Sequence, residues 1–246
     1  MACGLTLTSP PGAEAAEFSD YELQTTVFWD FNDDSTPDKA VDAVLGIEGT
    51  LTGVVDGPTA VYTDDALGRT LEAGDKAIDL TQGTAGPSIV VDDVDWLNEI
   101  AAGDRVSFSF WQQLTEITSM TVMKGASPSS SGSERGFSMH TPWSNSILYF
   151  DTAGCCDGAT QRVNRNIQGL IDDHEEIESF DFTDGWHHFA FVKDGTTKEI
   201  WVDGFLLLRG TNTSPLPTDF RQFVMGSSLN GSESLQGFLD EVALFK

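Results

Sequence analysis

Short runs in which apolar and polar residues alternate extend from Val27 to the end of the chain. The clearest is RVSFSFWQQL, residues 105–114, in which Val106, Phe108 and Phe110 occupy every second position. Successive side chains of a strand point to opposite faces of a sheet, so this spacing places the three apolar side chains on one face. The run therefore predicts a β-strand with one buried face.

A second segment, HHFAFVKDGTTKEIWVDGFLLLRG, covers residues 187–210 and contains three apolar runs. Asp-Gly pairs at 194–195 and 203–204 separate these runs, and Asp-Gly favours tight hairpins because it accepts a positive φ. The segment therefore predicts a meander of three antiparallel strands. The later sequences FVMGSS and GFLDEVALFK predict two more strands, and the domain is expected to be complete at Lys246.

The other apolar runs are short, as in a two-layer sandwich, and predict strands at 119–124, 136–140, 147–152 and 161–164. The Ser-rich stretch SPSSSGS (127–133) lies between two of them and is interpreted as a hairpin tip rather than an interdomain linker. Within residues 92–104 the helical spacing of Val94, Leu97 and Ile100 predicts one short helix.

The first part of the chain has a different character. Residues 1–22 include Pro10, Pro11 and an Ala/Glu-rich stretch, and they show no apolar alternation. This composition is typical of an arm that is flexible or packs against a partner. Residues 23–246 are predicted to form one all-β domain.

Composition narrows the possible partners. Hydrophobic residues make up 39% of the chain and include 16 Phe and 6 Trp, enough apolar surface for a packed core. The formal net charge of −26 repels nucleic acid and anionic membranes, so neither is an expected partner. The acidity suits a protein that stays soluble in salt- or calcium-rich surroundings. No run approaches the ~20 apolar residues of a membrane span, so no insertion is expected.

The three cysteines do not form an ordinary disulfide framework, because Cys155 and Cys156 are adjacent and Cys3 lies in the arm. Two readings stay open for the adjacent pair. Either it closes an unusual ring that stiffens the loop TAGCCDG, or it remains as two free thiols. In the first case Cys3 is an odd cysteine, free or linked to another chain.

The C-terminal half resembles the laminin G-like jelly roll of the concanavalin A-like superfamily. In that family a Trp-His pair opens a strand, an Asp-Gly hairpin follows a Trp or Tyr strand, and a Gly, hydrophobic, Asp-Glu-Val strand closes the domain. The matching positions are Trp186, His187, Trp201, Asp203, Gly204, Gly237, Asp240, Glu241 and Val242. VSFSFWQQL, DALGRTLEAGDKAIDLT and VFWDFND extend the resemblance upstream to about residue 27.

The resemblance implies a two-sheet antiparallel jelly-roll β-sandwich that binds glycans or proteins and seldom catalyses a reaction. It also implies a structural calcium ion that ties the first strand to the last. Asp30 and Asp240 are the best candidates to hold it, with Asp75 as a third. Calcium takes six to eight oxygens, which acidic loops can supply. The alternative is that these aspartates only cap turns.

A glycan site needs an aromatic ring that stacks on a sugar, with hydrogen-bonding side chains beside it. HTPWSNSILYF offers this mixture, because Trp143 follows a proline in a predicted turn. We therefore expect a ligand surface bordered by Trp143, Asn145, Asp151, Asp157 and Arg162. The alternative is that Trp143 plugs the end of the sandwich.

Catalysis has weaker support. Sandwich hydrolases carry two carboxylates two residues apart on one strand, and only Glu176 and Glu178 have that spacing here. Their acidic neighbours favour a solvated loop over a buried strand. The expected function is thus a lectin-like, carbohydrate-binding or adhesion module, secreted or at the cell surface, with a glycan or cell-surface protein as partner. The alternatives are a structural subunit that self-assembles through its arm and, less favoured, a glycoside hydrolase or lyase.

Overall fold

The computed structural model describes residues 25–53, 61–64, 67–81, 87–229 and 231–246. The predicted arm of residues 1–22, and Cys3 within it, lie outside these ranges. The described strands are β1 (Thr25–Trp29), β2 (Lys39–Val41), β3 (Glu48–Thr52), β4 (Ile78–Asp79), β5 (Ser88–Val91), β6 (Arg105–Leu114), β7 (Met123–Ala126), β8 (Arg135–His140), β9 (Ile147–Thr152), β10 (Arg162–Asn166), β11 (His187–Asp194), β12 (Thr197–Val202), β13 (Phe205–Thr211), β14 (Gln222–Met225) and β15 (Gly237–Phe245). The short helices are α2 (Asp95–Ala101), α3 (Ser131–Glu134) and α4 (Gln168–Asp173).

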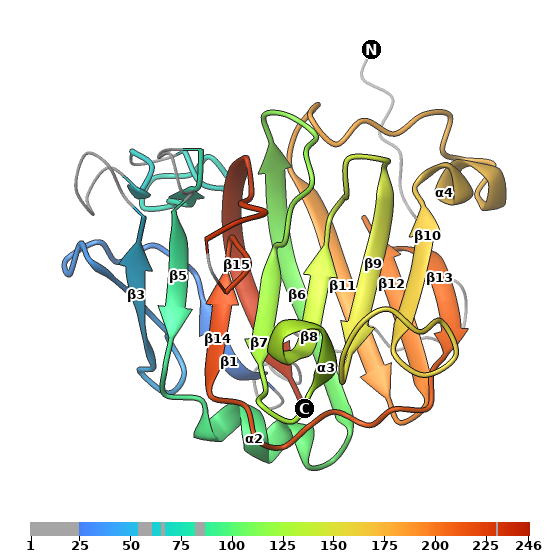
Figure 1. Cartoon of the computed structure of the whole chain (residues 1–246). Helices are drawn as coiled ribbons and strands as arrows, with labels where there is room; N and C mark the ends of the chain where they lie inside the picture. The colour runs from blue at the N-terminus through green and yellow to red at the C-terminus, as the bar shows by residue number, and fades with distance from the viewer. Residues whose placement is uncertain (1–24, 54–60, 65–66, 82–86, 230) are drawn as a thin grey trace, which may run out of the picture.

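Two sheets stack face to face (Figure 1). One has the order β1-β15-β6-β11-β12-β13, with β4 also paired to β15. The other, in front in Figure 1, has the order β10-β9-β8-β7-β14-β5-β3-β2. The strand pairs described in both sheets are antiparallel. The predicted all-β, two-sheet antiparallel jelly-roll sandwich is confirmed.

The core lies between the sheets, where the alternation along each strand places its apolar side chains. In β6 every second residue is buried, as the sequence predicts. Phe108 of this strand packs against Phe137 of β8 and Phe150 of β9 in the opposite sheet, with ring centroids 4.8 and 6.3 Å apart. Complete burial of one such ring contributes about 1.5–3 kcal/mol to folding. These rings therefore provide much of the attraction that joins the sheets.

The predicted meander is confirmed as β11, β12 and β13, and its second turn uses Asp203 and Gly204 at φ 50° and 83°. Other boundaries differ from the prediction. The strand expected at 119–124 begins only at Met123 and runs to Ala126. The physical reason is that the N–H of Thr121 donates to the carbonyl of Glu233, in a loop, and so leaves the sheet ladder.

The Ser-rich stretch connects β7 to β8, as predicted, and ends in α3, which lies over the outer face of the front sheet near the ends of these strands (Figure 1). Gly132 and Ser133 within α3 have φ of 66° and 62°, so this element is a turn rather than a regular helix. The helix predicted within 92–104 is α2, whose Trp96, Leu97 and Ile100 are buried.

Candidate ligand-binding site

One row of polar side chains crosses the outer face of the front sheet. Strand register pairs Lys124 of β7 with Ser138 of β8, Ser138 with Asp151 of β9, and Asp151 with Arg162 of β10. Adjacent residues in these strands, among them Met123, Phe137, Phe150 and Val163, are buried in the core. Alternation therefore forces the polar set to the outer face.

Loops rise around this row and enclose a cavity of about 320 Å³. Its lining includes two aromatic rings (Trp143 and Tyr149), two arginines (Arg135 and Arg162) and the pair Cys155 and Cys156. Trp143 comes from the turn between β8 and β9, and the cysteines come from the loop between β9 and β10. The cavity thus combines flat apolar surfaces with charged hydrogen-bond donors, which is the usual make-up of a site for a small polar ligand.

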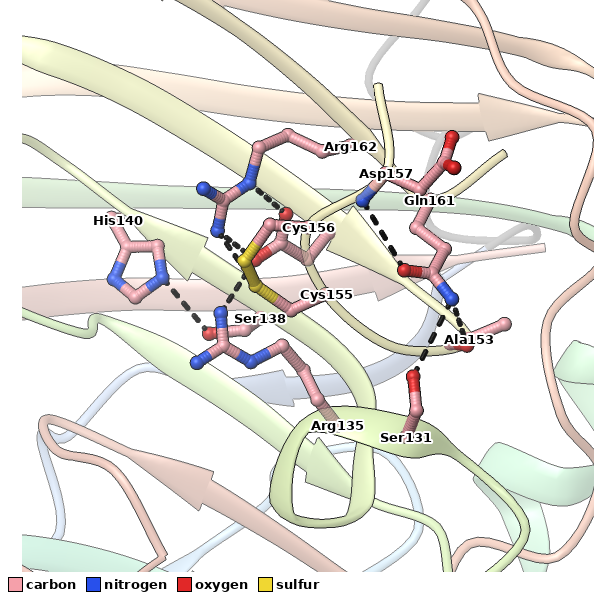
Figure 2. Close-up of a disulfide and its surroundings, with 11 residues drawn as sticks. Ser131, Arg135, Ser138, His140, Ala153, Cys155, Cys156, Asp157, Gln161 and Arg162 are labelled. Atoms are coloured by element: carbon pink, nitrogen blue, oxygen red, sulfur yellow. Dashed lines mark hydrogen bonds and ion pairs between the residues drawn. A yellow bond between two sulfur atoms is a disulfide. The ribbon is translucent and has the colours of Figure 1, made fainter. Parts of the chain in front are cut away.

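Asp151 holds the two arginines in place. Its carboxylate is completely buried and accepts hydrogen bonds from Nη1 of Arg135 at 2.6 Å, and from Nε and Nη2 of Arg162 at 2.5 and 2.6 Å. The pairing with Arg162 is bidentate, and this geometry fixes the plane of a guanidinium group. In the view of Figure 2 the two guanidinium groups lie on opposite sides of the bond between the cysteine sulfurs.

The aromatic side chains are fixed by their own contacts. The guanidinium carbon of Arg162 lies 4.5 Å from the ring centroid of Tyr149, and His140 meets Trp143 edge to face at 4.9 Å. Burial lowers the pKa of His140 to about 4, so this imidazole is neutral at pH 7. Its Nδ1 donates to the carbonyl of Met120 at 2.8 Å. The rings therefore project into the cavity from anchored positions.

Cys155 and Cys156 are joined by a disulfide, and Nη2 of Arg162 lies 3.3 Å from Sγ of Cys155. Gln161 braces their loop, because its side-chain Nε2 donates to the carbonyl of Ala153 at 3.3 Å and to Oγ of Ser131 at 3.5 Å (Figure 2). The disulfide therefore presents a small, rigid apolar surface to the cavity.

The residues that the sequence predicted at a ligand surface all lie in or near this cavity, but only some of them line it. Trp143 and Arg162 line the cavity, whereas Asp151 lies buried in its ion pairs. Asn145 is exposed, and its Nδ2 donates to the hydroxyl of Tyr149 at 3.3 Å. Asp157 caps the neighbouring turn, where hydrogen bonds from the N–H groups of Ala159 and Thr160 lower its pKa.

Sequence reasoning did not select Arg135, His140, Tyr149 or Glu233, which also line the cavity. For His140 and Tyr149 a signal was available. Both alternate with core residues of β8 and β9, and this period-two pattern is visible in the sequence.

The aspartates expected to hold calcium do not form one cluster. Asp240 is buried and accepts the N–H of Arg69 at 2.9 Å, and Asp75 accepts the N–H of Thr70 at 2.5 Å, so both hold the same turn. Burial, with Asp75 and Glu241 nearby, raises the pKa of Asp240 to about 7. Among the described residues, no group of three possible metal ligands includes Asp30 with these two. Asp75 and Asp240 thus hold one turn, and calcium binding at these aspartates stays a prediction.

The described part of the chain contains one triad with metal-ligand spacing, Asp151 with Cys155 and Cys156. It does not fit a metal ion, because the sulfurs are bonded to each other and the carboxylate is ion-paired to two arginines. Glu176 and Glu178 are exposed in the loop after α4 and do not lie on a strand.

A larger cavity of about 610 Å³ lies on the outer face of the other sheet. Trp111 of β6 and Phe28 of β1 line it, and the guanidinium of Arg69 lies 4.7 Å from the ring centroid of Trp111 while pairing with Glu241 at 2.7 Å. This cavity is mainly apolar and has one cation among its described lining residues, so it offers a polar ligand fewer hydrogen-bond donors than the cavity at Trp143.

The comparisons with known proteins concern the whole fold. Residues 85–246, well over half of the chain, match the family model Laminin_G_3, described as the Concanavalin A-like lectin/glucanases superfamily. No curated protein sequence matches the chain at a significant level. Among the described residues, no helix has the length and apolarity needed to cross a membrane.

Solved structures are similar in fold at low identity. Domain 4 of AbnA, a GH43 extracellular arabinanase from Geobacillus stearothermophilus, solved with arabinotriose, is 19% identical, with a TM-score of 0.58 over 91% of this chain and 92% of that one. A structure of botulinum neurotoxin type C, a toxin whose cell entry depends on interaction with two ganglioside molecules, is 14% identical, with a TM-score of 0.58 over 93% of this chain and 49% of that one. The binding domain of botulinum neurotoxin DC with rat synaptotagmin II is 12% identical, with a TM-score of 0.54 over 90% and 48%. The chain spans about half the length of these toxin chains.

Proposed function

The chain belongs to the Concanavalin A-like lectin/glucanases superfamily, and from this we propose that it is a carbohydrate-binding module that takes its ligand in the cavity at Trp143. The observation that carries the proposal is the pairing of Trp143 and Tyr149 with Arg135 and Arg162 around one cavity. Aromatic rings can stack on the apolar face of a sugar, while guanidinium groups donate hydrogen bonds to its oxygens. One structural neighbour was solved with arabinotriose, and another belongs to a toxin that interacts with two ganglioside molecules. Both neighbours support a sugar as the ligand class.

We propose binding without catalysis. Hydrolysis by two carboxylates requires one of them to donate a proton and the other to attack or activate water. Glu233 is the one carboxylate among the described residues of the lining, and Asp151 beneath it is held by two arginines. This arrangement supports recognition rather than bond cleavage.

The disulfide and the family support a module that works outside the cell, since disulfides persist in oxidising compartments. A protein at a cell surface is the second partner class that the neighbours support, through the neurotoxin domain solved with synaptotagmin II.

Replacement of Trp143 by alanine is expected to weaken binding to the best ligand of a glycan array by at least about tenfold, or about 1.4 kcal/mol, because a central aromatic contact is lost. Tyr149→Ala should act in the same direction. Isothermal titration calorimetry measures the affinities, and circular dichroism with thermal unfolding checks the fold.

Trp111→Ala is the matched control, because it removes an indole from the cavity on the other sheet. It should leave glycan affinity unchanged. If Trp111→Ala lost binding while Trp143→Ala bound fully, the ligand would lie in the cavity at Trp111, on the other sheet, and the proposed site would be refuted.

Calcium is the cofactor that the family resemblance implies, and Asp75 and Asp240 are the residues that would hold it. A ligand that binds only the folded state raises the melting temperature, so millimolar calcium should raise it by a few °C relative to EGTA. Asp240→Asn should abolish this difference, whereas Asp157→Asn, in a distant turn, should retain it. Equal melting temperatures of the parent protein in calcium and in EGTA would show that the folded protein does not bind calcium.

A further inference from the structure

A second, smaller cavity of about 240 Å³ adjoins the first and shares Arg135 and Glu233 with it. Lys124 of β7 reaches it from the sheet, and Ser228 and Ser232 line its far side. Because two residues belong to both linings, the two cavities are immediate neighbours.

Lys124 is unusual among the residues of this region. It is only 5% exposed. Among the described residues, no oxygen accepts a hydrogen bond from its ammonium group, although Glu134 and Glu233 act on it through space. Burial, with Arg135 nearby, lowers its pKa. Because Lys124 lines the cavity and its ammonium group has no acceptor among the described residues, an anion bound there would supply the acceptor and the counter-charge that the protein does not.

Arg135 adds a second donor. Its Nη1 is paired with Asp151, but its Nε is buried and has no hydrogen-bond partner. The described linings of the two cavities contain three cations, Lys124, Arg135 and Arg162, and one carboxylate, Glu233, while Asp151 and Glu134 lie next to these cations outside the linings. The excess of cations in these linings stands out in a chain whose net charge is −26.

We propose that the cavity at Lys124 is an anion subsite that holds the carboxylate or sulfate group of an acidic sugar. Lys124 and the guanidinium group of Arg135, whose side chains both line this cavity, are the donors to the anionic oxygens. A neighbouring sugar ring of the same glycan occupies the cavity at Trp143. The inference rests on the proposed function and adds to it the chemical class of the ligand.

The test uses a glycan panel printed in matched pairs, each an acidic glycan and its neutral counterpart, made by carboxyl reduction or by desulfation. The parent protein should bind the acidic member of its best pair at least about tenfold more tightly, and this preference should shrink as sodium chloride is raised. Whether the preferred pair is a uronate, a sialate or a sulfate identifies the source of the anion.

Calorimetry on that pair then compares Lys124→Met with Lys246→Met, an exposed lysine whose loss changes the net charge equally. Lys124→Met should lose the preference while binding the neutral glycan with the parent affinity, and Lys246→Met should keep the preference. The salt and pair comparisons on the parent protein need no variant, so they test the subsite even where Lys124→Met fails to fold.

Equal affinity for both members of each pair, or an undiminished preference in Lys124→Met, would overturn the anion subsite and leave the glycan-binding function standing. Absence of binding to every member of the panel would overturn the proposed function as well.

Discussion

Replacement of Asp151 by asparagine is expected to lower the free energy of unfolding by about 3–5 kcal/mol, because it leaves the guanidinium groups of Arg135 and Arg162 partly buried without their counter-charge. Glycan affinity should fall too, since both arginines would lose the contact that orients them. Urea denaturation followed by tryptophan fluorescence measures the first effect, and calorimetry the second.

Asp194→Asn is the control for this prediction. Asp194 pairs with Arg105 at the surface, where the two side chains are 59% and 72% exposed. An exposed ion pair contributes about 1 kcal/mol or less. If Asp151→Asn lowered the free energy of unfolding no more than Asp194→Asn does, the buried ion pairs would not organise the site.

The second large effect concerns Lys198, which is completely buried between the sheets. Burial and the nearby Lys193 lower its pKa to about 7, although its Nζ donates to the carbonyl of Gln161 at 2.7 Å. Between pH 7 and the unfolded-state pKa of 10.5, the unfolded chain binds a proton here that the folded chain does not. The free energy of unfolding therefore rises with pH across this window.

Lys198→Met should remove this dependence. Relative to the variant, the parent protein should gain roughly 1.4 kcal/mol of stability for each pH unit between about 7 and 10.5. At pH 7 and below, the variant should be the more stable of the two, because no charge is buried. Urea titrations at several pH values give the two curves. Lys246→Met should run parallel to the parent, and parallel curves for Lys198→Met would show that Lys198 keeps its ordinary pKa.

Most strands could be predicted from the sequence, because burial of one face produces a period-two pattern of apolar residues that does not depend on distant partners. It predicted β6 residue for residue and the β11–β12–β13 meander from its two Asp-Gly pairs. It misplaced the start of β7 because Thr121 bonds to the distant Glu233, a contact that no local pattern encodes.

The candidate site was predictable only in part, for a related reason. Trp143 and Arg162 come from loops and strand ends whose composition indicates recognition. Lys124 and Arg135, in contrast, reach the site through the register of β7 against β8 and the packing of the loop at Glu233. Register depends on which strands become neighbours, and in this sheet β7 lies between β8 and the distant β14. A lysine in a short strand gives no sign of these neighbours.

The position of β15 affects how the chain can acquire its structure during synthesis. This strand lies between β1 and β6, so residues that leave the ribosome late complete a sheet whose other members were made much earlier. Until then the edges of β1 and β6 that face β15 have unpaired N–H and C=O groups, which can pair with strands of other chains. Assembly of such distant strands is slow, and the incomplete chain is exposed to chaperones and to aggregation until β15 has paired.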